Sequence, residues 1–161
     1  MKKRALAGSF FCYNKIMKIR YTRDTLSSTY LDAIKIRQTV FVKGQGVPLA
    51  LEIDKNEAYC IHFVLYDETE KAAATCRLLP DKSQSSVTLQ RMAVLSGNRG
   101  KNYGKIILEA AMDFAKKQGF QKMDLHAQIA AQGFYLKMHF KPIGQEFEEA
   151  GIRHILMEKA L

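Results

Sequence analysis

The sequence predicts an α/β (α+β) domain with a mixed, mainly antiparallel central sheet of six to seven strands, flanked by about four helices. Its 161 residues, 47% of them hydrophobic, suffice for one core that folds without disulfide bonds. Apolar runs at residues 59–66, 72–79 and 87–95 are separated by short polar loops, a pattern typical of an antiparallel meander. A helical pattern at 106–118 and a strand-like run at 122–126 follow. Together with the preceding run they predict a strand–helix–strand unit whose two strands are parallel.

The domain is expected to span residues 16–161, after a loose N-terminal extension at residues 1–15. The extension carries four positive charges and no acid, so it supplies four units of the formal charge of +9 and leaves +5 for the domain. A charge of this size suits a small anionic ligand as well as a polynucleotide. No ladder of arginine and aromatic residues favours a polynucleotide, so we expect no nucleic-acid partner.

Cysteine and histidine positions indicate the compartment and argue against a metal site. The three cysteines are odd in number and widely spaced, which does not predict a disulfide framework and favours a reducing, cytoplasmic location. The four histidines show no metal-ligand spacing, so no metal is expected. No apolar run approaches the length of a transmembrane helix, so no membrane partner is expected.

The N-terminal part of the domain is predicted to hold one short strand and one helix. Residues 16–21 read as an edge strand, and Thr25 or Ser27 is a suitable N-cap for the helix that follows. Arg37 interrupts the apolar stripe of this helix. Most such arginines extend their charged end to solvent or pair with a carboxylate, though one near a binding cleft could meet a phosphate. The glycine-containing segment 43–48 ends the helix.

Two carboxylates, Glu52 and Asp54, lie in a predicted loop before the first long apolar run. A pair of acids there is suited to orient a cationic amine or to accept its proton. Solvated loop charges are the simpler interpretation, because most loop acids have no other role.

The C-terminal half continues the α/β pattern. Gly119 is a natural C-terminal cap for the helix at 106–118. A second helix is predicted at 129–138, and strands are predicted at 141–147 and 152–158.

A basic turn with two glycines joins the strand at 87–95 to the helix at 106–118; its sequence is Asn98-Arg99-Gly100-Lys101-Asn102-Tyr103-Gly104-Lys105. Glycines let the backbone come close to a ligand, and the first N–H groups of a helix have no partner within it. The helix dipole and the basic side chains favour an anion at the same place. The turn therefore predicts a phosphate or pyrophosphate site, with an ordinary exposed turn as the alternative.

The order of these elements resembles the GNAT superfamily of acyl-CoA-dependent N-acetyltransferases, from about residue 16 to residue 161. The signature turn of that family is Q/R-x-x-G-x-G/A, which this chain meets at Arg99 and Gly104. Asn102 replaces the middle glycine. Asparagine tolerates a positive φ better than other non-glycine residues, so the turn is expected to keep its shape.

A later family element is similar to Ala131, Tyr135 and Phe140, with His139 in place of the usual glycine. Several shorter matches resemble a small bacterial subgroup that is often grouped with glucosamine-6-phosphate N-acetyltransferases. These matches are Arg37-x-x-Val-Phe41, Glu52-x-Asp54, Ala74-Thr-Cys-Arg-Leu78, His126-Ala-Gln128 and Gly151-Ile-Arg-His154.

The resemblance implies acetyl-CoA as co-substrate, with its pyrophosphate on the basic turn and its pantetheine arm beside the strand that precedes the turn. A backbone N–H near residues 92–94 would stabilise the developing oxyanion. The implied cofactor-binding residues are Met92, Ala93, Val94, Arg99, Gly100, Lys101, Asn102, Tyr103 and Gly104.

The implied reaction is acetyl transfer to a primary amine of a small acceptor, by direct attack in a ternary complex. Tyr135 matches the family position of the acid that protonates the leaving thiolate. Glu52 and His154 rank together as candidates for the base that deprotonates the amine, ahead of Asp54 and His126. Acceptor pockets in the superfamily are built largely from variable loops, here around residues 47–57 and 148–151.

Two other functions remain open on sequence alone. One is a catalytically degenerate domain that binds acyl-CoA as a sensor or partner module, and the other is a basic nucleic-acid-binding protein. A homodimer is possible, because dimers are common in the families that the chain resembles.

Overall fold

The computed structural model describes residues 16–161, and the predicted extension at residues 1–15 lies outside the described residues. The described chain forms one seven-stranded sheet in the order β1-β2-β3-β4-β5-β7-β6. All neighbouring strands are antiparallel except β4 and β5. This sheet confirms the predicted fold class. Its strands are β1 (Lys18–Thr22), β2 (Ile61–Tyr66), β3 (Ala72–Pro80), β4 (Ser86–Val94), β5 (Lys122–Gln128), β6 (Lys141–Glu149) and β7 (Ile152–Ala160).

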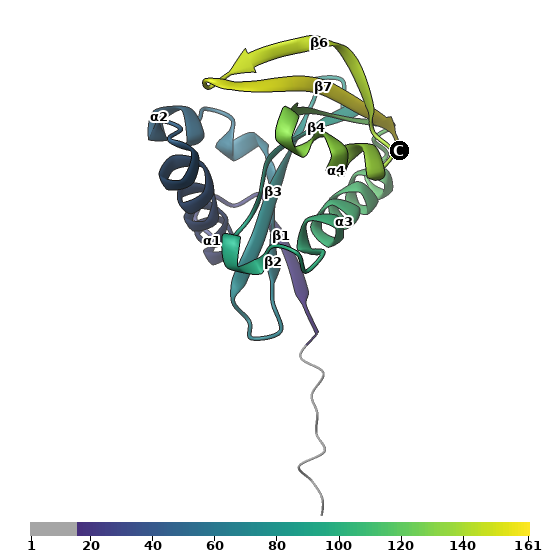
Figure 1. Cartoon of the computed structure of the whole chain (residues 1–161). Coiled ribbons are helices and arrows are strands. Elements are labelled where there is room, and N and C mark those ends of the chain that lie inside the picture. Colours follow the sequence, from purple (N-terminus) through teal and green to yellow (C-terminus); the bar gives the residue numbers. More distant parts are fainter. Residues whose placement is uncertain (1–15) are drawn as a thin grey trace, which may run out of the picture.

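Four α-helices and several shorter helical turns connect the strands (Figure 1). The α-helices are α1 (Ser28–Arg37), α2 (Leu49–Glu52), α3 (Tyr103–Lys117) and α4 (Gln132–Lys137). The shorter turns are the π-helical η2 (Gln38–Lys43) and the 3₁₀ turns η3 (Glu57–Tyr59), η4 (Ser96–Asn98) and η5 (Ile129–Ala131).

Local sequence explains where α1 begins and where α3 ends. Ser27 caps α1, because its side-chain oxygen accepts a hydrogen bond from the N–H of Tyr30 at 3.2 Å. Gly119 follows the end of α3 with a φ of +92°, a conformation that favours glycine. Both assignments confirm the sequence prediction.

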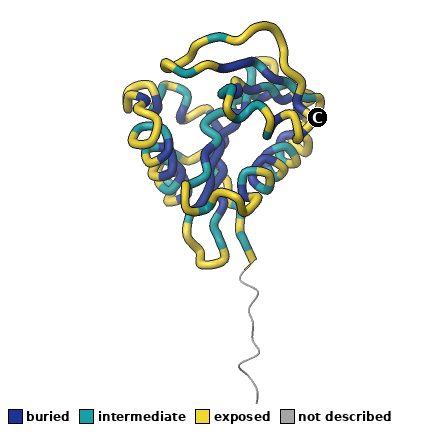
Figure 2. Tube along the Cα trace, viewed as in Figure 1, coloured by how far each residue is buried: buried dark blue, intermediate teal, exposed yellow. Residues whose placement is uncertain are grey.

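Helices α1 and α3 cover opposite faces of the central strands (Figure 1). Because neighbouring residues of a strand point to opposite faces, Val64 of β2 packs in the cluster that holds Ile36 of α1. Phe63 belongs to the larger cluster on the other face, with Ile107 and Ala111 of α3. The buried residues therefore run through the middle of the molecule, whereas the outer strand β6 is exposed along almost all its length (Figure 2).

Strands β4 and β5 pair over only four residues and then part. Their last paired residues are Leu89 and Leu125, while β4 continues beside β3 to Val94. A register shift between β3 and β4 and a positive φ of 57° at Arg91 show that β4 bends at this point. One edge of residues 90–94 is thereby freed from β5 and opens into a cleft.

Some predicted boundaries were wrong. Glu52 does not lie in a loop; it is the last residue of α2, a short helix that starts directly after Pro48. The predicted helix at 129–138 is divided into the 3₁₀ turn η5 and the six-residue α4. Tyr59 belongs to η3 rather than to a strand. These short elements carry too few residues for a periodic pattern to reveal them.

Candidate active site

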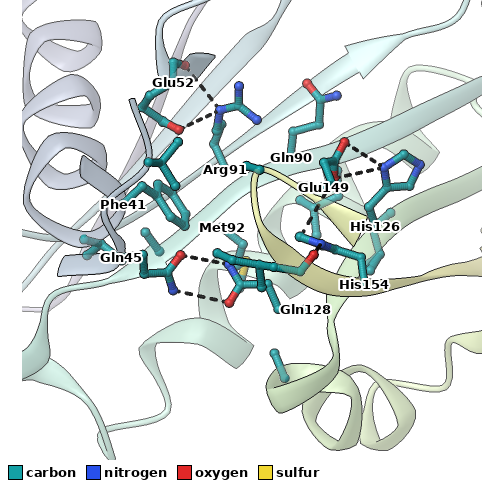
Figure 3. A pocket seen from close by; sticks show the side chains of 18 of the residues that line it. Phe41, Gln45, Glu52, Gln90, Arg91, Met92, His126, Gln128, Glu149 and His154 are labelled. Atoms are coloured by element: carbon teal, nitrogen blue, oxygen red, sulfur yellow. Dashed lines mark hydrogen bonds and ion pairs between the residues drawn. The ribbon is translucent and has the colours of Figure 1, made fainter. Parts of the chain in front are cut away.

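A cleft of about 690 Å³ lies where β4 and β5 part. The freed edge of β4 at residues 90–94 forms one wall, and His126 of β5, His154 of β7 and Tyr135 of α4 lie on the other. Gln45, from the segment between η2 and α2, also lines the cleft (Figure 3). The cleft thus draws its side chains from both halves of the chain.

A second hollow, of about 230 Å³, lies at the start of α3 and is lined by most of the predicted phosphate-binding turn. Val94, Arg99, Gly104 and Phe134 line both hollows, so the two adjoin. The side chain of Lys101 does not line either one; its Nζ lies 6.0 Å from the centre of the Tyr103 ring. Residues of the turn that line the second hollow are Asn98, Arg99, Gly100, Asn102, Tyr103, Gly104 and Lys105.

The turn has the backbone shape that an anion site requires. Asn102 has φ 62° and ψ 15°, so the expectation that asparagine adopts the left-handed conformation here is correct. Gly100 has a φ of +78°. Within residues 16–161, the backbone N–H groups from Gly100 to Lys105 donate no hydrogen bond to the protein. These donors, at the positive end of α3, are available to a phosphate.

Gly104 marks the junction of the two hollows. A Cβ built on it would lie 3.6–3.7 Å from Phe134, Met92 and Val94, which is ordinary contact and would not disturb the fold. The same Cβ would fill space that both hollows share. A glycine here therefore leaves room for a ligand that passes from one hollow to the other.

The freed edge of β4 offers backbone groups to the cleft. Met92, Ala93 and Val94 all line it, and this part of β4 has no partner in β5. The carbonyl oxygen of Val94 accepts a hydrogen bond from Nε of Arg99 at 3.3 Å. The predicted cofactor-binding residues of the strand and of the turn are thus brought together.

Tyr135 is 7% exposed and packs edge-on against the rings of Phe134 and Phe140. Its hydroxyl forms no hydrogen bond within the described chain. Every fully buried polar side-chain atom of the described chain has a hydrogen-bond partner, so this hydroxyl is not fully buried. The hydroxyl therefore reaches the cleft, which Tyr135 lines. Burial, with a smaller effect of Cys76, raises the pKa of Tyr135 well above its ordinary value. The phenol keeps its proton at neutral pH.

His154 has a fixed tautomer when neutral. Its Nδ1 lies 2.7 Å from the carbonyl oxygen of Ile152, which can only accept, so Nδ1 carries the proton and Nε2 the lone pair. The ring stacks on Phe147, with centroids 5.9 Å apart. Nε2 lies 3.8 Å from Oε2 of Glu149.

Glu149 lies between two imidazoles. The same Oε2 is 3.3 Å from Nδ1 of His126. Figure 3 marks this contact between Glu149 and His126 with a dashed line. Glu149 stands directly before the two-residue turn Ala150-Gly151, where the β6–β7 hairpin returns, and both Glu149 and Ala150 line the cleft. The sequence pointed to the loop at 148–151 but not to this residue, because the contact depends on how the hairpin lies over β5.

Glu52 is 3% exposed, and both of its carboxylate oxygens contact guanidinium groups. Oε1 lies 2.6 Å from Nε of Arg37, and Oε2 lies 3.1 Å from Nε of Arg91. The predicted pairing of Arg37 with a carboxylate is confirmed. The interpretation of Glu52 and Asp54 as solvated loop charges was wrong, since Asp54 also binds an arginine, Arg77, at 2.7 Å.

Glu57 joins these groups into a buried ionic network that the sequence did not reveal. Its carboxylate accepts hydrogen bonds from Arg37 at 2.8 and 2.9 Å, from Arg77 at 2.8 Å and from the hydroxyl of Tyr30 at 3.2 Å. Burial opposes ionisation of Glu57, but Arg37 and Arg77 outweigh it and lower the pKa of this carboxyl to about 2. The network supports α2, and with it one side of the cleft.

Two amides, Gln45 and Gln128, hydrogen bond to one another in the cleft, and Gln128 is the cross-strand partner of His154. Nε2 of Gln128 donates to Oε1 of Gln45 at 2.9 Å, and Nε2 of Gln45 donates to Oε1 of Gln128 at 3.2 Å (Figure 3). The two residues are 83 positions apart in sequence, so no local pattern could have paired them.

Within residues 16–161, no group of three or more histidine, cysteine, aspartate or glutamate side chains is arranged to hold a metal ion. Among the helices of the same range, none has the length and apolar character needed to cross a membrane.

Known proteins share both the sequence and the fold. Residues 39–161 match the family model described as an acetyltransferase (GNAT) domain. The uncharacterized N-acetyltransferase YjcF of Bacillus subtilis is 36% identical over 129 residues, 80% of this chain and 90% of that protein. A second B. subtilis protein, assigned as an acetyltransferase, is 33% identical over 131 residues, 79% of this chain and 86% of that protein.

The solved structures agree with the sequence matches. A Lactobacillus plantarum protein, assigned as an N-acetyltransferase, superposes with a TM-score of 0.83 at 27% identity, covering 90% of this chain and 98% of that one. The family match spans most of the chain, including β4, the basic turn at residues 98–105 and α4. This chain therefore belongs to the GNAT family of N-acetyltransferases.

Proposed function

We propose that the protein transfers the acetyl group of acetyl-CoA to a primary amine of a small acceptor, by direct attack in a ternary complex. The observation that carries this proposal is the junction of the two hollows at Gly104. One hollow presents free backbone donors at the start of α3, and the other presents the Tyr135 hydroxyl and the lone pair of His154. A long ligand with a phosphate at one end and a reactive group at the other suits this arrangement.

The residues present fit acetyl-CoA. The N–H groups from Gly100 to Lys105 and the Arg99 guanidinium would hold its pyrophosphate. The freed edge of β4 at Met92 to Val94 would bind the extended arm and present an N–H to a developing oxyanion. Acetyl-CoA supplies an acetyl group that is already activated as a thioester.

His154 is the base that the geometry favours. Nε2 is the unprotonated nitrogen of the neutral ring, His154 lines the cleft, and the Glu149 carboxylate lies 3.8 Å from Nε2. Glu52, the other predicted base, has both oxygens engaged by arginines. We therefore assign Glu52 the role of holding Arg91 and α2 in place.

Tyr135 is the proposed acid. It retains its proton because burial raises its pKa, and its hydroxyl is not committed to another protein group in the described chain. It can give that proton to a thiolate that departs beside it. A protonated amine thus gives one proton to His154, and its nitrogen bonds to the acetyl carbon. The carbon–sulfur bond breaks, sulfur gains the proton of Tyr135, and the second proton lost by the nitrogen restores the Tyr135 phenol.

The test is release of free CoA thiol from acetyl-CoA across a panel of small primary amines. Parent protein should release thiol with at least one amine, and Tyr135→Phe should lower kcat by about 10²–10⁴-fold with little change in KM for acetyl-CoA. Equal kcat in Tyr135→Phe would refute the role of this residue. Binding of CoA without thiol release from any amine would favour the degenerate sensor instead.

A further inference from the structure

We infer that the acceptor is a cationic amine without a phosphate or carboxylate group, and that Glu149 is the residue that binds its ammonium. The inference rests on the proposed function and specifies the substrate class of the same cleft. It follows from a comparison of the charged side chains of the cleft that have an oppositely charged partner in the protein with those that have none.

Four residues with permanent charges line the cleft: Glu52, Arg91, Arg99 and Glu149. Arg99 stands at the end shared with the phosphate-binding hollow. The other three lie in the remaining part of the cleft, where an acceptor would bind.

Arg91 is largely committed to the protein, and Nη1 is its one nitrogen without an acceptor in the described chain. Its Nε lies 3.1 Å from Oε2 of Glu52, and its Nη2 lies 3.3 Å from Oδ2 of Asp54 and 3.0 Å from the carbonyl oxygen of Leu51. Moving Arg91 to a substrate phosphate would take one partner away from Glu52, which is 3% exposed. An acid that is buried without its partner is costly, so the network opposes this exchange.

Glu149 is in the opposite situation. In the part of the chain that the structure describes, its carboxylate contacts no arginine or lysine; its neighbours are the imidazoles of His126 and His154. Its side chain remains 51% exposed and lies at the cleft (Figure 3). With Glu52 and Arg91 paired, Glu149 leaves the acceptor end of the cleft with an uncompensated negative charge.

This placement also suits the chemistry. An ammonium held by Oε2 of Glu149 would lie near Nε2 of His154, because those two atoms are 3.8 Å apart. The group that attracts the protonated amine is therefore next to the group proposed to deprotonate it. A phosphate or carboxylate at the same end would be repelled by Glu149, and the charge of Arg91 is already shared between Glu52 and Asp54.

Two further polar side chains of the cleft are uncharged amides. Gln45 and Gln128 hydrogen bond to one another across the cleft, and either amide can exchange its partner for a hydroxyl or an amide of a ligand at little cost. The cleft is thus suited to an amine whose other polar groups are uncharged, such as an amino alcohol or an unphosphorylated amino sugar.

The experiment compares amines that differ only in a phosphate: ethanolamine with phosphoethanolamine, and glucosamine with glucosamine 6-phosphate. Calorimetric binding to the CoA-bound protein is measured first, so that the result does not depend on turnover. We expect each unphosphorylated amine to bind at least about tenfold more tightly, the factor expected for one charge-assisted contact. Tighter binding of the phosphorylated partner, equal binding or no binding of any of the four would overturn the inference.

Variants at Glu149 test the residue. Glu149→Gln should raise KM for the amine about tenfold or more and leave KM for acetyl-CoA unchanged. Glu146→Gln is the matched control, since Glu146 lies on the same strand and pairs with Arg153 at the surface. An unchanged amine KM in Glu149→Gln would refute its role. Preferential amine binding without thiol release would leave the inference standing and refute the proposed function.

Discussion

Replacement of Glu57 by glutamine is expected to remove much of the stability of the domain. The carboxylate is 7% exposed and accepts hydrogen bonds from both Arg37 and Arg77. Its pKa falls from 4.5 to about 2 in the folded protein, because the two arginines outweigh the opposing effect of burial. At about 1.36 kcal/mol per pKa unit, this shift corresponds to about 3 kcal/mol of stabilisation of the folded state above pH 4.5.

Glu57→Gln keeps the shape of the side chain but removes its charge, and so leaves the guanidinium groups of Arg37 and Arg77 short of a counter-ion. Breaking a buried ion pair in this way typically costs about 3–5 kcal/mol. Urea unfolding at pH 7, followed by circular dichroism, measures the loss. Glu109→Gln is the control, because Glu109 is half exposed and its ion pair with Lys105 is long, at 3.9 Å. This substitution should lower the free energy of unfolding by less than about 0.5 kcal/mol.

The pH dependence gives a second measurement. A lowered pKa means that the stabilisation is complete above the unfolded value of about 4.5 and is lost as the pH falls towards about 2. The parent protein should therefore lose about 3 kcal/mol more than Glu57→Gln over this interval. A loss below about 1 kcal/mol at pH 7, together with parallel pH curves, would refute the view that this network stabilises the fold.

Three further predictions concern the backbone near the cleft. Asn102→Val should weaken binding of CoA strongly, because a β-branched residue disfavours the φ of 62°, whereas Asn102→Gly should preserve it; equal dissociation constants by calorimetry would contradict this. Gly104→Ala should raise the melting temperature, because alanine is more favourable than glycine in a helix by about 1 kcal/mol. The same substitution should raise KM for acetyl-CoA by filling the junction of the hollows; an unchanged KM would show that the ligand does not pass there. His139→Gly should stabilise the protein by up to about 1 kcal/mol, because His139 has a φ of 67°; a lower melting temperature would indicate that its side chain matters more than its backbone.

The fold was largely predictable because its elements carry strong local patterns. The apolar runs of β2, β3 and β4 are long enough to identify as strands, and the glycine after α3 marks its end. The left-handed backbone at Asn102 also followed from local chemistry, since few residues tolerate it. The structure adds that His139, which replaces a family glycine, has a positive φ of 67°.

The polar arrangement around the cleft could not be predicted in the same way. Arg37 and Glu57 are 20 positions apart in sequence, and Gln45 and Gln128 are 83 positions apart, yet each pair is hydrogen bonded. Such pairs depend on how strands and loops lie in space, which a single sequence does not encode as a short-range pattern. Residue type suggested His154 and Glu52 equally as bases, and only their hydrogen bonds distinguish the two.

The narrow pairing of β4 with β5 also has a mechanical consequence. Only residues 86–89 and 122–125 join the two halves of the sheet in register, and within residues 16–161 every other strand pair is longer. One half carries the freed edge of β4, and the other carries His154 and the helix of Tyr135. A twist about this short pairing would move His154 and Tyr135 together relative to the freed edge of β4, at the cost of few hydrogen bonds.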